Sequence, residues 1–387
     1  MLRQIFEITL MNLRNLPSRL ASSSVIVVGI AGVVGVLMGL LSMAAGFEKS
    51  LAGAGQADRA IIQRDGSTSE MNGNMTQEQR DTIRAMEGVL YGSGEIYTVA
   101  AINKLGTDIA ANVVVRGVEH SAFHVRPEVQ MVSGRRFEPG RAEVIVGVKA
   151  AAQFANLAVG DEVPVRDQAW TVVGHFEANN SAYESEIWVD LATAQSTYRR
   201  GGTSSTMRVL MESPEALAAL DQRLRDDPRF DLVARSEVDH YAEQSEDRTA
   251  LIEGFGVVVG VIMAIGAVFA ALNTMYSAVS QRTVEIATLR AVGFGSIPVV
   301  VSVMIEAVFL ALLGGLLGAA VVWLAFDGYT ASTLNNASFS QVAFDFAVTP
   351  ELVRLGITWA LVLGVIGGLF PAVAAARLPI TTALRGE

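Results

Sequence analysis

The sequence predicts an α-helical membrane protein with four transmembrane helices and a large α+β extracytoplasmic domain inserted between helices 1 and 2. Three observations lead to this fold class. The 387-residue chain contains four long apolar runs, its whole net charge of -10 lies between Gly46 and Ala250, and arginines flank the runs unevenly. The membrane part and the aqueous part of the chain are therefore considered separately.

The four apolar runs are long enough to cross a membrane. Three of them carry no charge, and the third along the chain carries only Glu306. The runs are Leu20–Phe47, Gly254–Gln281, Ala291–Phe326 and Leu355–Ala376. Because about 20 apolar residues span the ~30 Å hydrocarbon core as a helix, each run predicts one transmembrane helix.

The first run has two interpretations. Ala44 and Ala45 near its end could mark a signal-peptide cleavage site, but a signal peptide has a short apolar region of about 7–15 residues close to the N-terminus. This run is longer and begins only at Leu20, which favours a retained signal anchor.

Before it, residues 2–16 predict an amphipathic helix along the inner membrane surface, ended by Pro17, with a simple extension of the first span as the alternative. Its apolar face would contain Leu2, Ile5, Phe6, Leu13 and Leu16, and its charged face Arg3, Glu7 and Arg14.

The positions of the arginines predict the orientation, since basic residues near helix ends favour the cytoplasm. They gather before the first run, between the second and third, and after the fourth, whereas the segment from Asp327 to Pro350 has none. Arg354 is the one exception. The residues on the predicted cytoplasmic side are Arg3, Arg14, Arg19, Arg282, Arg290, Arg377 and Arg385. Both termini are thus expected in the cytoplasm and the large domain on the extracytoplasmic side.

This topology divides the chain into nine segments. The predicted order is a cytoplasmic amphipathic helix (1–19), transmembrane helix 1 (20–47), the extracytoplasmic domain (48–249), transmembrane helix 2 (250–280), a cytoplasmic coupling segment (281–296), transmembrane helix 3 (297–326), an extracytoplasmic loop (327–350), transmembrane helix 4 (351–376) and a cytoplasmic tail (377–387).

The extracytoplasmic domain is predicted to mix helices and strands. Thr76 with Gln79 forms the pattern of a capping box, and Ser213-Pro214 is typical of a helix start. A tight hairpin is expected at Asp167-Gln168, and a mobile loop at 66–74. The predicted helices are 76–86, 149–157 and 213–225, and the predicted strands are 112–116, 143–147, 163–166, 170–176 and 186–189.

Several classes of activity are disfavoured. The acidic aqueous part argues against a nucleic-acid partner, and the chain has no cysteine, so no disulfide or cysteine-bound metal is expected. No G-x-x-x-x-G-K-[ST] sequence occurs, so we expect no nucleotide site. His120 and His124 have helical spacing but no third ligand, and no nucleophile elbow is present. The sequence therefore predicts a non-catalytic chain without a cofactor of its own.

Glu306 is the only ionisable residue deep in a predicted span. A charge left in hydrocarbon costs at least ~2.5 kcal/mol on insertion scales, so its side chain should face protein, be paired or be protonated. The sequence does not name a partner. Gly314, Gly315 and Gly318 follow it and offer a small surface for close helix packing, within the chain or across a dimer.

Two segments near the membrane have a distinctive pattern. Residues 281–294, QRTVEIATLRAVGF, form a charged, helix-compatible segment between two spans, suited to a partner's groove or serving only as a connector. Within this segment Arg282 and Glu285 are three residues apart, a favourable pairing distance on a helix. Residues 367–385, GGLFPAVAAARLPITTALR, place a proline in the last turns of a span, then an arginine and a second proline.

Both segments resemble signatures of the FtsX-like permease family of ABC transporters. The first resembles a coupling segment, R-x-x-E-I-x-x-L-[RK]-A-[IV]-G, matched by Arg282, Glu285, Ile286, Leu289, Arg290, Ala291, Val292 and Gly293. The second resembles the family's closing motif, matched by Pro371, Ala372, Ala375, Arg377, Pro379, Ala383, Leu384 and Arg385, with the second proline one place early. Met304–Ala307 and the glycine pair Gly314-Gly315 also resemble the family's third helix.

The extracytoplasmic part resembles the MacB-type periplasmic core domain more loosely. Four segments follow that domain's order: 134–137, 143–147, 159–161 and 170–174. The resemblance implies two lobes, a membrane-near lobe from the two ends of the domain and a distal lobe from about His120 to Arg200, and it makes His120 and His124 structural.

The family resemblance implies the partners and the mechanism. It implies a separate cytoplasmic ABC ATPase that binds ATP and Mg, a second permease copy or paralogue in a dimer, and mechanotransmission to the extracytoplasmic domain. A periplasmic membrane-fusion adaptor is a further partner that it allows. The size of the domain favours export or extraction of a substrate that the sequence does not identify. A signalling or regulatory subunit that moves no substrate is the alternative, followed by a membrane-anchored enzyme.

Overall fold

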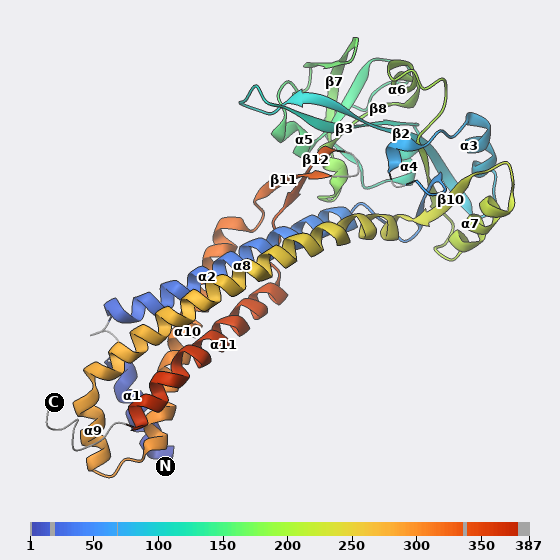
Figure 1. Ribbon diagram of the computed structural model, residues 1–387. Helices are drawn as coiled ribbons and strands as arrows, with labels where there is room; N and C mark the ends of the chain where they lie inside the picture. The colour runs from blue at the N-terminus through green and yellow to red at the C-terminus, as the bar shows by residue number, and fades with distance from the viewer. Residues whose placement is uncertain (1, 16–19, 68, 336–338, 378–387) are drawn as a thin grey trace. The chain divides into compact units, whose positions relative to one another are not determined.

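The computed structural model describes residues 2–15, 20–67, 69–335 and 339–377. They form two compact units, which we call the helical unit and the sheet domain and describe separately (Figure 1). The helical unit comprises Met1–Ala45, Thr249–Tyr329 and Phe346–Glu387, and the sheet domain comprises Gly46–Arg248 and Thr330–Asp345.

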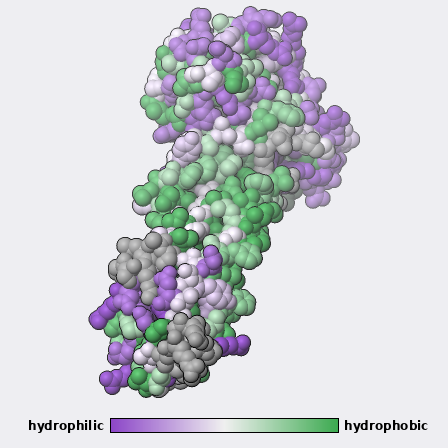
Figure 2. Space-filling view, turned by 60° about the vertical axis from the view of Figure 1, so that its left-hand side comes forward, coloured by the Kyte–Doolittle hydropathy of each residue, from purple (hydrophilic) through white to green (hydrophobic). Residues whose placement is uncertain are grey.

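Six helices contribute to the helical unit. They are α1 (Leu2–Arg14), α2 (Leu20–Ala52), α8 (Glu237–Gln281), α9 (Thr283–Ala291), α10 (Ser296–Phe326) and α11 (Pro350–Arg377), of which α2 and α8 continue into the sheet domain. Four of them, α2, α8, α10 and α11, are long and apolar enough to cross a membrane. This agrees with the four predicted spans. Figure 2 shows hydrophobic residues over much of the visible face of this unit and hydrophilic residues over that of the sheet domain.

Small residues let the long helices approach closely. A Cβ added at Gly260 of α8 would lie 3.2 Å from Leu37 of α2, and one at Gly364 of α11 would lie 2.4 Å from Ala311 of α10. Ile30, Val34 and other apolar side chains from α2, α8, α10 and α11 form the shared core. The buried faces therefore carry glycine and alanine where two backbones meet, as in other membrane bundles.

Two helices differ from the prediction. α8 is 45 residues long and begins at Glu237, whereas the predicted span began at residue 250. The prediction missed the first turns because apolar composition marks only the part of a helix that is suited to hydrocarbon. α1 buries Ile8 and Asn12, but Phe6 of the predicted apolar face is 64% exposed. α1 packs on α10 through the buried face, and a location along the membrane surface remains a prediction.

One mixed sheet forms the framework of the sheet domain. Its strand order is β10-β1-β9-β2-β3-β8-β5-β7-β4, with β6 paired to β7. β3 with β8 and β5 with β7 are parallel, and the other pairs are antiparallel. The strands are β1 (Arg59–Arg64), β2 (Val89–Asn103), β3 (Ala110–Val118), β4 (Gln130–Gly134), β5 (Glu143–Gly147), β6 (Glu162–Val165), β7 (Gln168–Glu177), β8 (Glu186–Asp190), β9 (Thr206–Met211) and β10 (Leu232–Ser236).

Short helices cover this sheet and enclose two cores. The helices are η2 (Glu70–Asn72), α3 (Gln77–Arg84), α4 (Ala122–Val125), α5 (Val148–Gln153), η3 (Ala182–Ser185), α6 (Leu191–Thr197) and α7 (Ala216–Asp226). One core gathers around Trp170 with side chains of α5 and α6. The other gathers around Ile62 with side chains of α3 and α7. The sheet domain thus has two cores on one continuous sheet, and the core around Trp170 includes Ile96 and Val113, which lie outside the predicted distal lobe of about His120 to Arg200.

The local predictions in the sheet domain were partly right. The capping box of Thr76 and Gln79 is confirmed, with both reciprocal hydrogen bonds present, and β5 has the predicted bounds. The hairpin turn lies at Arg166-Asp167, one residue earlier than expected, because Val165 pairs with Gln168. α7 begins at Ala216, after Ser213-Pro214. Strands β1, β2, β4, β9 and β10 were not predicted.

Two segments expected to be loops are structured. Residues 66–74 were predicted to be mobile, but they contain η2, whose Glu70 is only 6% exposed. The predicted loop 327–350 contains strands β11 (Thr330–Asn335) and β12 (Ser340–Asp345), which form an antiparallel hairpin within the sheet domain. In both cases short polar segments gain their order from contacts with distant parts of the chain.

Candidate functional site

The predicted coupling segment forms a short helix between two sharp changes of direction. α8 ends at Gln281, and Arg282 interrupts the helix with φ -107° and ψ 10° before α9 begins. α9 ends in a Schellman motif, in which Phe294 N donates to Leu289 O (3.0 Å) and Gly293 N to Arg290 O (3.2 Å). Gly293 has φ +108°, a conformation that favours glycine.

The residues of the predicted coupling motif face two ways. Arg282 and Ile286 are buried, and Leu289 packs against the core of the helical unit. Glu285 is exposed and Arg290 half-buried. The inward residues thus fix α9 to its own chain, whereas the outward surface is left to Glu285, Arg290 and exposed apolar neighbours. The motif therefore has two structural roles that its spacing alone did not separate.

Arg282 is the partner of Glu306. Arg282 Nη1 donates to Glu306 Oε2 (2.9 Å) and Nη2 to Glu306 Oε1 (2.6 Å), a bidentate ion pair. Both side chains are about 95% buried, at 6% and 5% exposure. The predicted i,i+3 pairing of Arg282 with Glu285 is not the interaction formed. The pair joins the start of α9 to α10.

A second polar contact lies on α10 next to this pair. Asn12 Nδ2 of α1 donates to Ser302 Oγ (2.8 Å), one helical turn before Glu306. Asn12, Arg282 and Glu306 line a small cavity between α1, α8, α9 and α10, and Arg282 Nε has no hydrogen-bond partner among the described residues. These four helices therefore meet at one partly satisfied polar site in apolar surroundings.

The three glycines after Glu306 serve contacts within the chain. A Cβ added at Gly314 or Gly318 would lie 2.8 Å from Val27 O or 2.6 Å from Ala31 O, both in α2. One at Gly315 would lie 2.6 Å from Ala360 of α11. Among the described residues, these glycines thus lie in close contact with α2 and α11.

The closing motif lies only partly within the described residues. α11 continues through the buried Pro371 and ends at Arg377. Pro379 and Arg385 lie outside the described residues, as do Ala383 and Leu384.

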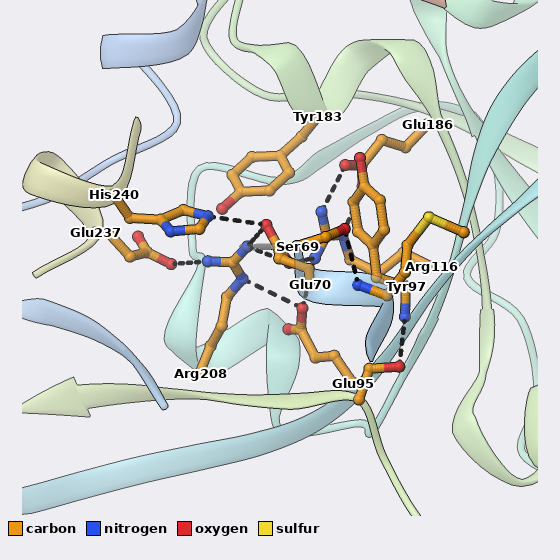
Figure 3. Close-up of polar contacts among 12 residues, drawn as sticks. Ser69, Glu70, Glu95, Tyr97, Arg116, Tyr183, Glu186, Arg208, Glu237 and His240 are labelled. Atoms are coloured by element: carbon orange, nitrogen blue, oxygen red, sulfur yellow. Dashed lines mark hydrogen bonds and ion pairs between the residues drawn. The ribbon is translucent and has the colours of Figure 1, made fainter. Parts of the chain in front are cut away.

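The sheet domain contains a second and larger buried charge site (Figure 3). Three guanidinium groups and four carboxylates meet where strands β2, β3, β8 and β9 face η2 and the first turns of α8. We call these residues the charge network. They are Glu70, Glu95, Arg116, Arg126, Glu186, Arg208 and Glu237, none more than 6% exposed.

Arg116 and Arg208 are the centres of this network. Arg116 of β3 donates to Glu186 through Nε (2.7 Å) and Nη2 (2.6 Å), and its Nη1 reaches Glu95 (2.8 Å) and Glu70 (3.1 Å). Arg208 of β9 donates to Glu70 (2.9 Å), Glu95 (3.2 Å) and Glu237 (2.9 Å). Each of these two guanidinium groups therefore has three carboxylate partners.

The first turns of α8 enter the network directly. Glu237 is the first residue of α8, and four residues later Tyr241 accepts a hydrogen bond from Arg208 Nη2 (3.0 Å). Tyr241 donates in turn to Tyr183 (2.9 Å), and His240 Nε2 lies 3.2 Å from Glu70 Oε1. The long helix is thus fastened inside the sheet domain by three side chains on its first two turns.

The network sets the charge state of its carboxylates. Burial alone would raise the pKa of Glu70, but the positive charges of Arg208 and Arg116 outweigh it and hold the pKa well below its ordinary value. The pKa of Glu95 is lowered in the same way, against burial, by Arg126, Arg116 and Arg208. Burial raises the pKa of Tyr183 to about 12. Glu70 and Glu95 are therefore ionised and Tyr183 is neutral at physiological pH.

None of the network residues was singled out from the sequence. Charged residues within otherwise apolar strands, such as Arg116 in VVVRGV, were the available signal. Glu70 gave no signal, because its burial comes from a polar segment. The histidines bring no metal site together: His124 stacks on Tyr91 with ring centroids 5.0 Å apart. Within the described residues no group of three or more His, Cys, Asp or Glu could hold a metal ion.

Comparison with known proteins places this architecture in a family. The family model of the MacB-like periplasmic core domain matches residues 22–227, and that of the FtsX-like permease C-terminal domain matches residues 257–380. Together they cover the sheet domain's main segment and the helices that carry α9 and the Arg282–Glu306 pair. The chain belongs to the FtsX-like, MacB-type family of ABC transporter permeases.

Individual relatives are distant. The chain is 25% identical over 385 residues to the macrolide export ATP-binding/permease protein MacB of Nitrobacter winogradskyi. The aligned region covers 93% of this chain and 57% of that protein. It is 22% identical over 277 residues to an uncharacterized ABC transporter permease of Methanocaldococcus jannaschii, covering 67% of this chain and 68% of that one. The chain therefore spans little more than half the length of the first of these relatives.

A solved structure also matches part of the chain. The periplasmic region of MacB from Actinobacillus actinomycetemcomitans matches 49% of this chain and 93% of that one, with 14% sequence identity and a TM-score of 0.38.

Proposed function

We propose that this chain is the permease subunit of an ABC transporter and transmits ATP-driven motion of a separate ATPase subunit to its extracytoplasmic domain. The observation that carries the proposal is the construction of α9. Its inner face is fixed by Arg282, Ile286 and Leu289, while Glu285 and neighbouring apolar residues are exposed. A short helix fixed on one side and exposed on the other suits docking into a partner.

The exposed surface of α9 has the composition of a protein-binding site. Val284 and Val292 are 56% and 76% exposed, and Ile297 at the start of α10 is 58% exposed. Apolar side chains beside the charged groups of Glu285 and Arg290 resemble an interface core with a polar rim. We propose that a cytoplasmic ATPase, holding ATP and Mg, covers this surface, and that a second permease copy or paralogue completes a dimer.

α8 provides the route for the motion. It has 45 residues without an internal proline and extends from Glu237 to Gln281, a contour length of about 68 Å at 1.5 Å per residue. Arg282 follows at one end, and the charge network holds Glu237 and Tyr241 at the other. A continuous helix held at both ends can transmit displacement. This supports mechanotransmission rather than passage of substrate between the helices.

The location and cargo follow as parts of the same proposal. We propose an inner-membrane protein with both termini and α9 in the cytoplasm and the sheet domain outside, from the arginine distribution. Its cargo would be exported or extracted from the membrane or periplasm, with a membrane-fusion adaptor as a further partner. The alternative, a signalling subunit, uses the same motion but moves no substrate.

Charge reversal on α9 tests the proposal. Glu285→Arg or Arg290→Glu should leave membrane insertion and the folded sheet domain intact but abolish co-purification with the ATPase or stimulation of its turnover. Like charges placed against a complementary interface typically cost several kcal/mol. The assay is the ATPase activity of the reconstituted pair, with protease resistance of the sheet domain as the folding check.

A matched control is available elsewhere in the helical unit. Glu351 in the first turn of α11 is also exposed, with a side-chain exposure of 69%. Glu351→Arg should retain coupling. Full coupling in both α9 variants would reduce this helix to a connector and remove the proposed entry point of energy.

A further inference from the structure

The hairpin of β11 and β12 is an integral part of the sheet domain. Six residue pairs join its two strands, from Thr330 with Asp345 to Asn335 with Ser340. Polar contacts attach it to three other elements of the sheet domain. Ala343 N donates to Ser185 Oγ of η3 (2.9 Å), Lys149 Nζ of α5 lies 3.4 Å from Asp345 Oδ2, and Asn112 Nδ2 of β3 donates to Phe339 O (3.0 Å).

Apolar burial strengthens this attachment. Val342, Ala343 and Phe344 of β12 are 5%, 1% and 0% exposed. The Phe344 ring packs edge-on against Phe47 in the last turns of α2, with centroids 5.5 Å apart and an interplanar angle of 83°. Burying one such aromatic side chain contributes roughly 1.5–3 kcal/mol. The hairpin is therefore held by a combination of polar and apolar contacts and not by its own turn alone.

The connections between this hairpin and the helices are short and tied together. Only Asp327–Tyr329 separate α10 from β11, and only residues 346–349 separate β12 from α11. Gly328 N donates to Phe346 O (3.1 Å), Phe346 N to Tyr329 O (3.0 Å) and Val348 N to Asp327 Oδ1 (3.1 Å). These bonds limit the length of free chain through which movement of α10 could be lost.

α10 itself is fixed near its other end to α9. The bidentate Arg282–Glu306 pair joins it to the residue that precedes α9, and α1 reaches Ser302 one turn earlier. From Glu306 to Phe326 the helix is uninterrupted, a rise of about 30 Å. α10 thus has one anchored end beside α9 and continues at the other end into a hairpin anchored in the sheet domain.

We infer that α10 and the β11–β12 hairpin form a second route by which motion of α9 reaches the sheet domain, in parallel with α8, and that Arg282 and Glu306 are its positioning residues. The inference rests on the proposed function. The two routes end on different side chains of the domain. α8 ends on the charge network around Arg208 and on Tyr183 of η3, whereas the hairpin ends on Ser185 of η3, on α5 and on the start of β3.

Hydrogen–deuterium exchange of the full chain, purified with its ATPase, tests this route. Flexible six-residue Gly/Ser insertions after Gly328 and after Phe346 lengthen both connections and leave the hairpin sequence unchanged. In the wild-type complex, trapping with ATP and vanadate should change exchange roughly twofold or more at residues 148–153 and 340–345 and at 237–244. The double insertion should abolish the change at the first two segments and retain it at the third.

Two further variants distinguish loss of transmitted motion from a local structural effect of the insertions. The same insertion between Gly201 and Gly202, an exposed turn with positive φ at both residues, should behave as wild type. The double neutral variant Arg282→Gln/Glu306→Gln interrupts the route at its inner end and leaves the hairpin untouched. It should also lose the response at 148–153 while retaining it at 237–244.

The outcomes distinguish this inference from the proposed function. A wild-type response at 237–244 without one at 340–345, or a full response at both hairpin segments in the double insertion, would overturn the second route alone. A wild-type complex with no ATP-dependent change in any segment would overturn the proposed function, and the second route with it.

Discussion

The two units bury charge in opposite ways. In the helical unit one arginine meets one carboxylate, Arg282 with Glu306, among apolar side chains, and Arg282 Nε has no hydrogen-bond partner among the described residues. In the sheet domain Arg208 alone reaches three carboxylates and a tyrosine. The first site is a single ion pair, whereas in the second Arg208, Arg116 and Glu95 each pair with three opposite charges.

This difference suits different mechanical roles. A single pair fixes one helix to one neighbour, and loss of either member leaves the other charge uncompensated in a region of low polarity. A network joins several elements at once, because displacement of one element strains contacts with all the others. The pair therefore has the properties of a joint beside α9, and the charge network those of an anchor for the first turns of α8. Removing charges one at a time sharpens or breaks this comparison.

The largest effect is expected from Glu95→Gln. Glu95 is fully buried and accepts hydrogen bonds from Arg116, Arg126 and Arg208. Loss of its charge removes the carboxylate that pairs with Arg126 and one of the carboxylates that pair with Arg116 and Arg208, so the free energy of unfolding of the sheet domain should fall by about 5 kcal/mol. Urea unfolding followed by fluorescence of the buried Trp170 and Trp188 measures it.

Glu177 provides the matched control for that experiment. It ends β7 and is exposed, so Glu177→Gln should change the unfolding free energy by less than about 0.5 kcal/mol. Equal stability of the two glutamine variants would show that the network does not depend on the charge of Glu95.

A smaller effect is expected from Glu306→Leu. Arg282 would keep its charge and lose its sole carboxylate partner among the described residues, which should destabilise the helical unit by about 3 kcal/mol and impair assembly or activity. Thermal unfolding in detergent, followed by gel filtration, measures the loss. The double variant Arg282→Leu/Glu306→Leu should recover most of the stability. A single variant as stable and active as the wild type would remove the pair from the mechanism.

The smallest effect concerns a partly exposed pair in the sheet domain. Two hydrogen bonds from Arg135, each 2.7 Å, lower the pKa of Glu143 at the start of β5 to about 2. Because the pKa in the folded state is below the ordinary value of 4.5, this contribution is complete above pH 4.5 and disappears as the pH falls through 2. Arg135 is 48% exposed, so solvent limits the contribution to about 1 kcal/mol or less.

Glu143→Gln checks the sign of that dependence. Glutamine does not titrate, so the wild type should be the more stable protein at neutral pH, and its advantage should shrink as the pH falls from 4.5 towards 2. Urea unfolding of both proteins at several pH values measures the difference. An advantage that grows on acidification would contradict the assigned pKa.

Part of the functional site could be predicted from the sequence, and part depended on contacts between distant segments. The coupling motif located α9, and the cost of a charge in hydrocarbon identified Glu306 as a residue that needs a partner. The partner itself lies 24 positions away in a different segment, so spacing rules for a single helix favoured Glu285 for Arg282 instead. The inward orientation of Ile286 and Leu289 likewise depended on helices outside the motif.

The sequence alone determined the four apolar helices, the capping box at Thr76 and the family, because each depends on contiguous residues or on a short motif. The tertiary structure decided which charges meet, that Glu70 is buried, that β1, β9 and β10 join one sheet, and that β11 and β12 belong to the sheet domain. All of these depend on contacts between segments far apart along the chain. Such contacts form only when the free energy gained by burying distant surfaces outweighs the conformational entropy lost in bringing them together. A local sequence pattern does not predict that balance.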